Sequence, residues 1–220
     1  MAQDASGRGR GRPRAGEGPD LAHLLHAALD AFAESGYDGT SVRQLSRRLG
    51  VSHALLTARF GSKEGLWFAA MEHTLTLIEP TWRVSTQPSE LDDLDVLRGA
   101  IIEQVLFSAA HPQVLRIMGH EGGIDSPRVR FVVERFVNPL RPGIETLLSR
   151  LADAGRIRPV PYATLHYLVV AGGGAPYANP VEAALLGAPA HPDADTIRAH
   201  AETIADTLIA GITTTPPPDR

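Results

Sequence analysis

The chain has 220 residues, 43% of them hydrophobic and 21% charged, which are ordinary proportions for a soluble globular protein of one or two domains. It contains no cysteine, which excludes disulfide bonds and cysteine-ligated metal sites. No apolar run approaches the roughly 18 residues that a membrane span needs, and no secretory signal is visible, so we expect a cytoplasmic protein. The net charge of −4 is uneven, because residues 1–63 hold 9 Lys and Arg against 6 Asp and Glu while the remainder is acidic. This asymmetry fits a protein that touches a polyanion with one end, although chance clustering on a solvated helix would give the same charges.

The N-terminal segment changes character at residue 20. Residues 1–19 are rich in Gly, Arg, Pro and Ala, and we expect a disordered arm there. A first helix should begin at Asp20, a good N-cap, and end at Gly36. Its apolar positions recur at helical spacing: Leu21, Leu24, Leu25, Ala28 and Phe32.

Two short helices follow. The first should start at Thr40 and Ser41, which are both good caps, and end at Gly50. The second should cover residues 52–58, with Ser52 as its cap. The inward positions of the two helices are Val42, Leu45, Leu49, Leu56 and Phe60. Two short helices joined by a glycine-containing turn predict a helix-turn-helix.

The rest of the chain also has helical periodicity. Ser62 should cap a helix that runs to Glu79, with Leu66, Ala70, Thr74 and Leu77 on its apolar stripe. Further helices are expected at 92–110, 112–119, 126–154 with a kink near Pro139, 162–171, 181–186 and 195–212, and Gly172–Gly174 should bend or break the chain. The prediction is an all-α fold with a disordered arm at 1–19, a three-helix helix-turn-helix domain at 20–66, a helical domain at 67–213 and a flexible tail at 214–220.

A specific resemblance covers 35 of the 220 residues, from Phe32 to Leu66. The carrying motifs are Phe32-Ala33 before Gly36-Tyr37, then Thr40-Ser41-Val42, Gly50-Val51-Ser52, and Phe60-Gly61-Ser62-Lys63-Glu64. Together they resemble the TetR family of bacterial repressors. The resemblance implies a DNA-reading head, and a C-terminal half that binds a small effector and forms a homodimer.

The expected contacts with double-stranded DNA lie on the two short helices and their ends. Hydroxyls at helix starts can meet phosphates, and arginine can read guanine. The candidates are Thr40, Ser41, Arg43, Gln44, Ser52, His53, Ala54, Leu55, Thr57, Arg59 and Lys63. Two positions depart from the family, whose members often carry a basic residue at the place of His53 and an aromatic at that of Thr57. Packing is an alternative role for Leu55, and simple exposure is one for Thr57.

The arm has its own arginines: Arg8, Arg10, Arg12 and Arg14. Their Gly-Arg-Pro setting resembles AT-hook segments, in which extended arginines enter the minor groove of A·T-rich DNA. The alternative is a basic tail that attracts DNA without reading its sequence.

The C-terminal half supplies candidates for an effector pocket and a dimer interface. The pocket candidates, for which ordinary core packing is the alternative, are Trp82, Phe107, Met118, Phe131 and Tyr167. The resemblance implies an interface of two helices per subunit, and the candidates are Leu165, Leu168, Val169, Ile197, Ala201, Ile204 and Leu208.

No sequence motif supports catalysis, a bound cofactor or a metal site. The spacings of His111, His120, Glu121 and His166 match no metal motif. Neither Ser126 nor Ser149 has a nucleophile motif around it, and Gly172–Gly174 does not form a phosphate-binding loop.

The leading hypothesis is a ligand-responsive repressor, released from a palindromic operator by a small apolar or amphipathic effector. A DNA-binding regulator or activator without a ligand is the first alternative. A helical ligand carrier or small enzyme with a vestigial helix-turn-helix is the second.

Overall fold

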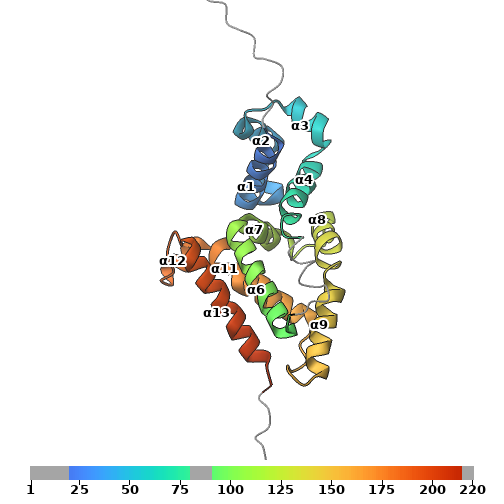
Figure 1. Cartoon of the computed structure of the whole chain (residues 1–220). Coiled ribbons are helices and arrows are strands. Elements are labelled where there is room, and N and C mark those ends of the chain that lie inside the picture. Colours follow the sequence, from blue (N-terminus) through green and yellow to red (C-terminus); the bar gives the residue numbers. More distant parts are fainter. Residues whose placement is uncertain (1–19, 80–90, 215–220) are drawn as a thin grey trace, which may run out of the picture.

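The computed structural model describes residues 20–79 and 91–214, and every helix and turn of these ranges belongs to an all-α architecture. A small head stands on a larger body (Figure 1). The β-structure of the described ranges is limited to one isolated antiparallel bridge between Ile157 and Thr213. None of the helices in these ranges has the length and apolar character that a membrane span needs. The predicted fold class, with an N-terminal helix-turn-helix, is confirmed.

The head is made of four helices: α1 (Leu21–Gly39), α2 (Val42–Leu49), α3 (His53–Phe60) and α4 (Lys63–Leu75). Each begins with the side-chain cap that the sequence predicts, which are Asp20, Ser41, Ser52 and Ser62. At Ser41 the cap is reciprocal, because the Gln44 side chain accepts a hydrogen bond from the Ser41 N–H. These caps satisfy N–H groups that would otherwise lack partners at the helix starts.

The hydrophobic core of the head continues into the body. Leu45 of α2, Leu56 of α3 and Trp67 of α4 are at most 2% exposed. Their cluster also includes Ile117 and Phe136 from the body. The predicted domain boundary at residue 66 falls inside α4. Because the cluster includes residues of both parts, the head and the body share buried apolar surface.

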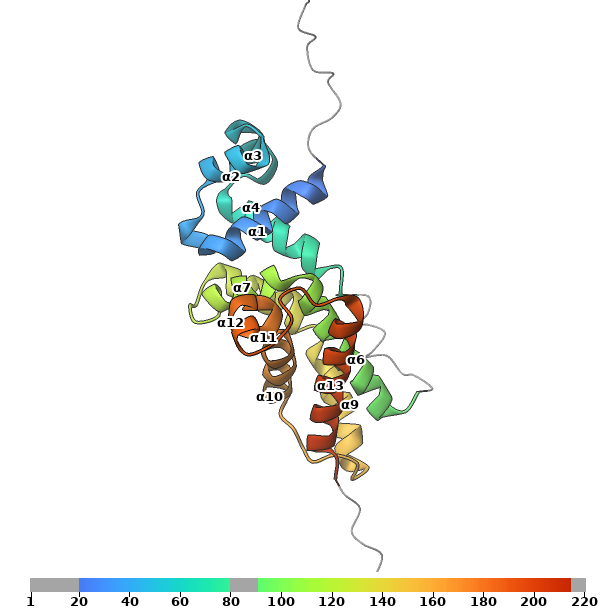
Figure 2. The same cartoon turned by 90° about the vertical axis from the view of Figure 1, so that its left-hand side faces the viewer.

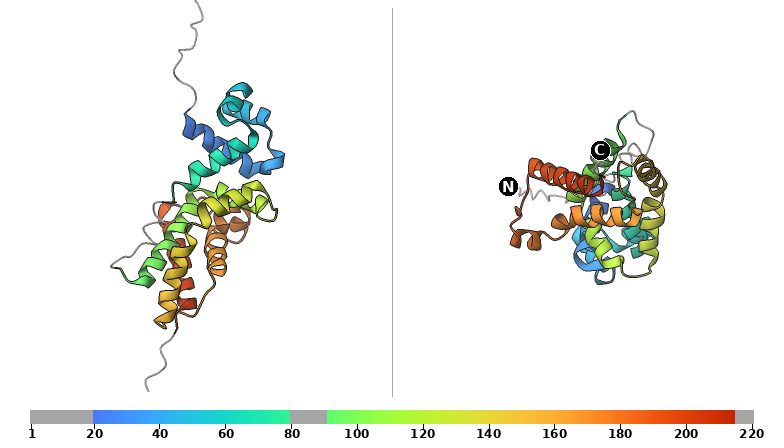
Figure 3. Two further views of the ribbon diagram at one scale, coloured as in Figure 1. Left: turned by 90° about the vertical axis from the view of Figure 1, so that its right-hand side faces the viewer. Right: turned by 90° about the horizontal axis from the view of Figure 1, so that it is seen from below.

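The body contains the remaining elements, among which two short π-helical segments, η1 and η2, interrupt longer helices. In chain order they are α6 (Asp93–Ala110), α7 (Pro112–Glu121), α8 (Pro127–Val132), η1 (Val133–Val137), α9 (Arg141–Asp153), α10 (Tyr162–Tyr167), η2 (Leu168–Gly172), α11 (Gly173–Ala178), α12 (Pro180–Leu185) and α13 (Ala194–Ile212). In Figure 2, α6, α9 and α13 run alongside one another below the head. Figure 3 shows the short α12 at the outer edge of the body.

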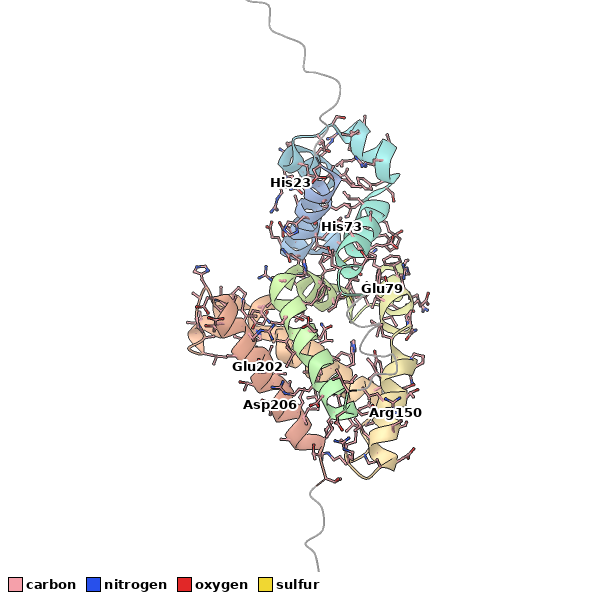
Figure 4. The ribbon with its side chains drawn as sticks, in the orientation of Figure 1. His23, His73, Glu79, Arg150, Glu202 and Asp206 are labelled. Carbon is pink, nitrogen blue, oxygen red and sulfur yellow. The ribbon has the colours of Figure 1, made fainter. Side chains whose placement is uncertain are left out.

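Ion pairs fasten α6 to its neighbours at the surface. Arg150 of α9 donates to both carboxylate oxygens of Asp93, at 2.6 and 2.9 Å. On the other side of α6, Arg98 donates to Asp206 of α13 at 2.6 Å. Figure 4 shows Arg150 and Asp206 on the two helices that flank α6. Both arginines hold the pKa of their carboxylate partner below its usual range, mainly by hydrogen bonding.

Two details differ from the prediction. Helix α4 ends at Leu75 instead of Glu79, and Leu77 is 56% exposed although it was expected on the apolar stripe. The chain also stays helical through Gly172 and Gly173, where a bend or break was predicted, with a π-helical turn in η2. A Cβ on Gly173 would lie 2.6 Å from Cγ2 of Val105, so glycine serves close helix packing there.

Candidate DNA-binding surface and ligand cavity

The two short helices of the head bury one face each and expose the other. Gly50 joins them in a left-handed conformation, with φ of 65°. Leu45 anchors α2 and Leu56 anchors α3, at 1% and 2% exposure. Because only one large side chain of each helix is fully buried, the opposite faces are free to meet a partner.

Most of the predicted DNA contacts lie on these exposed faces. The exposed candidates are Ser41, Arg43, Gln44, Ser52, His53, Ala54, Leu55, Thr57 and Arg59. Leu55 is 42% exposed, which disfavours packing as its role. His53 and Thr57, the two positions that depart from the family pattern, lie one helical turn apart, with 3.4 Å between Nδ1 and Oγ1. They present a joined polar pair on the outer face of α3.

Thr40 is the exception, and its prediction as a DNA contact is wrong. It is only 5% exposed, and its hydroxyl lies 2.7 Å from the carbonyl oxygen of Gly36 and 3.1 Å from that of Ala31. Its N–H is bonded to the Tyr37 carbonyl. The side chain therefore fastens the loop before α2, because its hydrogen-bonding capacity is used inside the head.

The basic side chains of the head divide into paired and unpaired groups. Arg48 donates to both oxygens of Glu34, at 2.5 and 2.8 Å, and this hydrogen bonding lowers the pKa of Glu34. Across the described ranges, Arg43, Arg47 and Arg59 have no carboxylate within ion-pair distance. Lys63 is partly buried, and its Nζ lies 4.1 Å from the centre of the Tyr37 ring. The exposed face thus carries uncompensated positive charge, which favours a polyanionic partner.

Gly65 is a positioning residue that the sequence reasoning missed. A Cβ at this place in α4 would lie 2.1 Å from the carbonyl oxygen of Phe60. The same carbonyl accepts a hydrogen bond from the Ser62 N–H at 2.8 Å. Only glycine permits this tight elbow between α3 and α4, and a glycine three residues after a serine cap was the available signal.

A cavity of about 1230 Å³ lies in the body, below the head. Of the candidate pocket residues, Phe107, Met118 and Tyr167 line this cavity, with Tyr167 71% exposed. Phe131 does not line it, because its ring packs against Phe68 with 4.7 Å between ring centres. Trp82 and the four arm arginines Arg8, Arg10, Arg12 and Arg14 lie outside the described residues.

One wall of the cavity carries three polar side chains: Gln104 and Ser108 of α6, and His111, the residue that ends this helix as its C-cap. Gln104 is 7% exposed, and its Nε2 donates to the Ser108 hydroxyl at 3.2 Å. Two atoms on this wall, Gln104 Oε1 and His111 Nδ1, have no partner among the described residues. Gln104 could not be predicted from the apolar stripe of 92–110, because a single polar residue within such a stripe does not indicate a cavity.

Burial favours the neutral form of two histidines that line the cavity. Burial is the main cause that lowers the pKa of His111, with His26 and His73 contributing, and burial also lowers that of His166. Within the described residues, no group of His, Asp or Glu is arranged to hold a metal ion. The polar wall can therefore pair with an uncharged hydroxyl, amide or carbonyl of a ligand.

Three of the predicted dimer residues are wrong. Leu165, Val169 and Ala201 are at most 7% exposed and belong to the core around α6. Ile204 and Leu208 pack against the same core, and Ile197 is half-buried. Leu168 is 47% exposed. The apolar stripe of α13 faces its own chain, and the sequence could not tell an internal neighbour from a partner subunit.

Comparison with known proteins agrees with this geometry. Residues 24–70 match the model of the family described as bacterial regulatory proteins, tetR family. The transcriptional repressor AcnR of Corynebacterium efficiens is 28% identical over 65% of this chain and 72% of its own. Other curated regulators are 38–42% identical over 52–56 residues, so this chain spans less than a third of their length.

Residues 24–70 are thus a TetR-family DNA-binding domain. Among solved structures, the ketosteroid regulator KstR2 of Mycobacterium tuberculosis has a TM-score of 0.67 at 20% identity, covering 91% of this chain and 99% of its own. AibR, solved with isovaleryl coenzyme A and operator DNA, has a TM-score of 0.63 at 19% identity, covering 86% and 96%. The TetR-family match lies on the head, whereas the body shares only its fold with these neighbours. This protein is thus a DNA-binding transcriptional regulator.

Proposed function

We propose that this TetR-family regulator is a repressor whose release from a palindromic operator is controlled by a small apolar or amphipathic effector in the body cavity. The observation that carries the proposal is the cavity of about 1230 Å³, because its lining includes Ala33 of α1 as well as residues of α7. An occupant that displaced α7 would also displace α1 of the head, because α7 packs against α1. We propose that the protein works on DNA in the cytoplasm.

The proposed reading surface is the outer face of α3 with its flanks. Arg59 is placed to reach a guanine, and the His53–Thr57 pair to reach bases or phosphates beside it. The phosphates of the DNA backbone would be contacted by Arg43, by the cap hydroxyls of Ser41 and Ser52, and by Lys63. For Lys63 this requires the amine to leave the Tyr37 ring.

The arm at 1–19 would add affinity through its arginines. Deleting residues 1–15 tests this, since each lost phosphate contact reduces the slope of log affinity against log salt by about 0.9. An unchanged slope removes the arm from the mechanism.

A homodimer would place two heads on successive major grooves, about 34–36 Å apart. The faces of α10, η2 and α13 that point away from the core support this. Leu168 is exposed there, and so are the small side chains of Ala199, Thr203 and Thr207 on α13. Small residues let helices of two subunits approach closely.

The proposed effector has an apolar portion and at least one uncharged polar group. The apolar portion would fill the space around Phe107 and Met118, and the polar group would form hydrogen bonds with Gln104 and His111. The acyl thioester bound by AibR combines an acyl chain with polar groups, so acyl coenzyme A esters belong in the screen beside fatty alcohols and sterols.

Two measurements test the proposal. Mobility shift with duplex from the protein's own promoter region should show binding much tighter than to random duplex at the same salt, and equal affinities would contradict the proposal. Thermal-shift screening should identify a compound that raises the melting temperature and releases the duplex. A DNA-binding chain that no compound stabilises or releases would instead be a regulator without a ligand.

A further inference from the structure

The junction between head and body contains a charged cluster that the reading surface and the cavity do not account for. Its centre is Arg128, the second residue of α8, whose side chain is 13% exposed. The guanidinium donates from Nε to Glu121 Oε1 at 2.9 Å and from an Nη to Glu64 Oε1 at 3.3 Å. Its Cζ also lies 3.7 Å from the centre of the Tyr37 ring. We call these four residues the Arg128 clamp.

The clamp joins two elements of the head to two of the body. Glu64 is in the first turn of α4, and Tyr37 follows the kink of α1 at Gly36. Glu121 is the last residue of α7, and Arg128 lies in the first turn of α8. The Arg128 guanidinium therefore contacts the start of α4, which follows the reading helix α3. It also contacts the end of α1, which precedes the helix-turn-helix.

The body side of the clamp is rigid. Glu121 is only 3% exposed, and its second oxygen accepts a hydrogen bond from the buried Ser126 hydroxyl at 2.8 Å. Ser126 in turn caps α8 by accepting from the Val129 N–H. A buried carboxylate with both oxygens bonded holds its arginine in one orientation.

The clamp residues are direct neighbours of the cavity wall. His120, next to Glu121, and Val129, next to Arg128, both line the cavity. The His120 ring also lies under the head, since a Cβ on Gly36 would be 3.6 Å from it. A movement of α7 or α8 around an occupant would therefore shift the anchors of Arg128 directly.

We propose that Arg128 is a positioning residue that fixes the orientation of the reading head on the body, and that the clamp is the contact through which the cavity acts on that orientation. The inference rests on the proposed switching of the head by an effector. The fixed orientation is a property of the chain alone, however, and can be tested without effector or DNA.

The chain has no cysteine, so two introduced cysteines can be spin-labelled selectively. Ala58→Cys on α3 and Ser149→Cys on α9 are both at exposed positions. Electron–electron distance measurement, on labelled chains diluted with unlabelled ones, reports the head-to-body distance within one chain. Glu64→Gln removes the head-side charge of the clamp and leaves the buried Arg128–Glu121 pair intact. The matched control is Glu34→Gln, which removes a carboxylate that pairs with Arg48 within the head.

The unsubstituted chain and the control should give the same narrow distance distribution, whereas Glu64→Gln should broaden and shift it. Arg128→Met alone would strand the buried Glu121, so it is combined with Glu121→Gln, and this double variant should broaden the distribution further. The melting temperature of Glu64→Gln should stay close to that of the control. The inference is overturned if Glu64→Gln and the double variant both give the same distance distribution as the labelled chain without these substitutions. That result would leave the proposed DNA binding and effector release untouched.

Discussion

The head and the body place their polar side chains in opposite ways. In the head, Arg43, His53 and Arg59 lie on exposed faces over an apolar core. In the body, Gln104 and His111 face an internal cavity. Under the proposed function, the polar groups on the surface would contact DNA, whereas the buried ones would contact an effector inside the cavity. DNA contacts can therefore change without altering the core of the head, while a change of effector alters side chains inside the body.

This comparison explains where the family match lies. The head must keep its caps, its tight elbow and its buried anchors, whatever operator it reads. The body shares its fold with the solved neighbours at 19–20% identity.

Gly65→Ala should damage the head selectively. The added Cβ would meet the Phe60 carbonyl at 2.1 Å, and the backbone has to shift, which costs about 1–3 kcal/mol or more. We expect a lower melting temperature and loss of DNA binding. Gly99→Ala is the matched control, because nothing lies within 4 Å of its added Cβ on α6. It should leave stability unchanged or increase it, and equal losses in both variants would contradict the account.

Arg59→Ala should reduce operator affinity by about 1–3 kcal/mol and relax the choice of base at one position. Arg158→Ala, which removes an exposed arginine of the body, away from the reading surface, is the control. Affinities for operator and random duplex, measured at several salt concentrations, distinguish the two. If Arg59→Ala weakens both duplexes alike, Arg59 holds a phosphate and reads no base.

Gln104→Leu should affect only the body. The unsubstituted side chain buries an oxygen without a partner, so its removal should leave effector-free stability unchanged or raise it by about 1 kcal/mol. The same variant should lose most of the melting-temperature shift that an effector produces, while its affinity for DNA is retained. Ser149→Ala, an exposed change on α9, controls for substitution itself. A full effector shift in Gln104→Leu would remove the polar wall from recognition.

The cavity histidines should make stability fall in acid. Burial lowers the pKa of His111 and His166 in the folded chain, so the unfolded chain takes up their protons first as the pH falls below the ordinary value of about 6.5. The free energy of unfolding should therefore rise from pH 5 to pH 7, to the extent these residues govern it. His111→Gln should flatten that rise and His191→Gln, at an exposed position, should not. Denaturant titration at several pH values measures both slopes.

The sequence predicted the head in detail because its signals are local. Serine caps, the glycine between α2 and α3 and the apolar anchors each act within a few residues. The exception was Thr40, because the sequence pattern did not show that its hydroxyl turns inward to the carbonyl oxygens of Gly36, four residues before it, and Ala31, nine residues before it.

The body was predicted less completely because periodicity identifies an apolar face but not the neighbour that covers it. Leu165, Val169 and Ala201 were assigned to a partner subunit and in fact face α6. Phe131 was assigned to the pocket and packs on Phe68 instead. Long-range contacts of this kind, like the Arg128 clamp, join residues that are far apart in the chain.

The central claim is that the exposed face of α3 reads a defined operator. Genome-wide selection of DNA fragments by the full chain, compared with selection by its Arg59→Ala variant, tests it most directly. The account predicts that the unsubstituted chain enriches one palindromic motif, with half-sites about one helical turn of DNA apart, and that the variant loses enrichment at a base of each half-site. Enrichment of no motif by the unsubstituted chain, or an identical motif for both proteins, would contradict it.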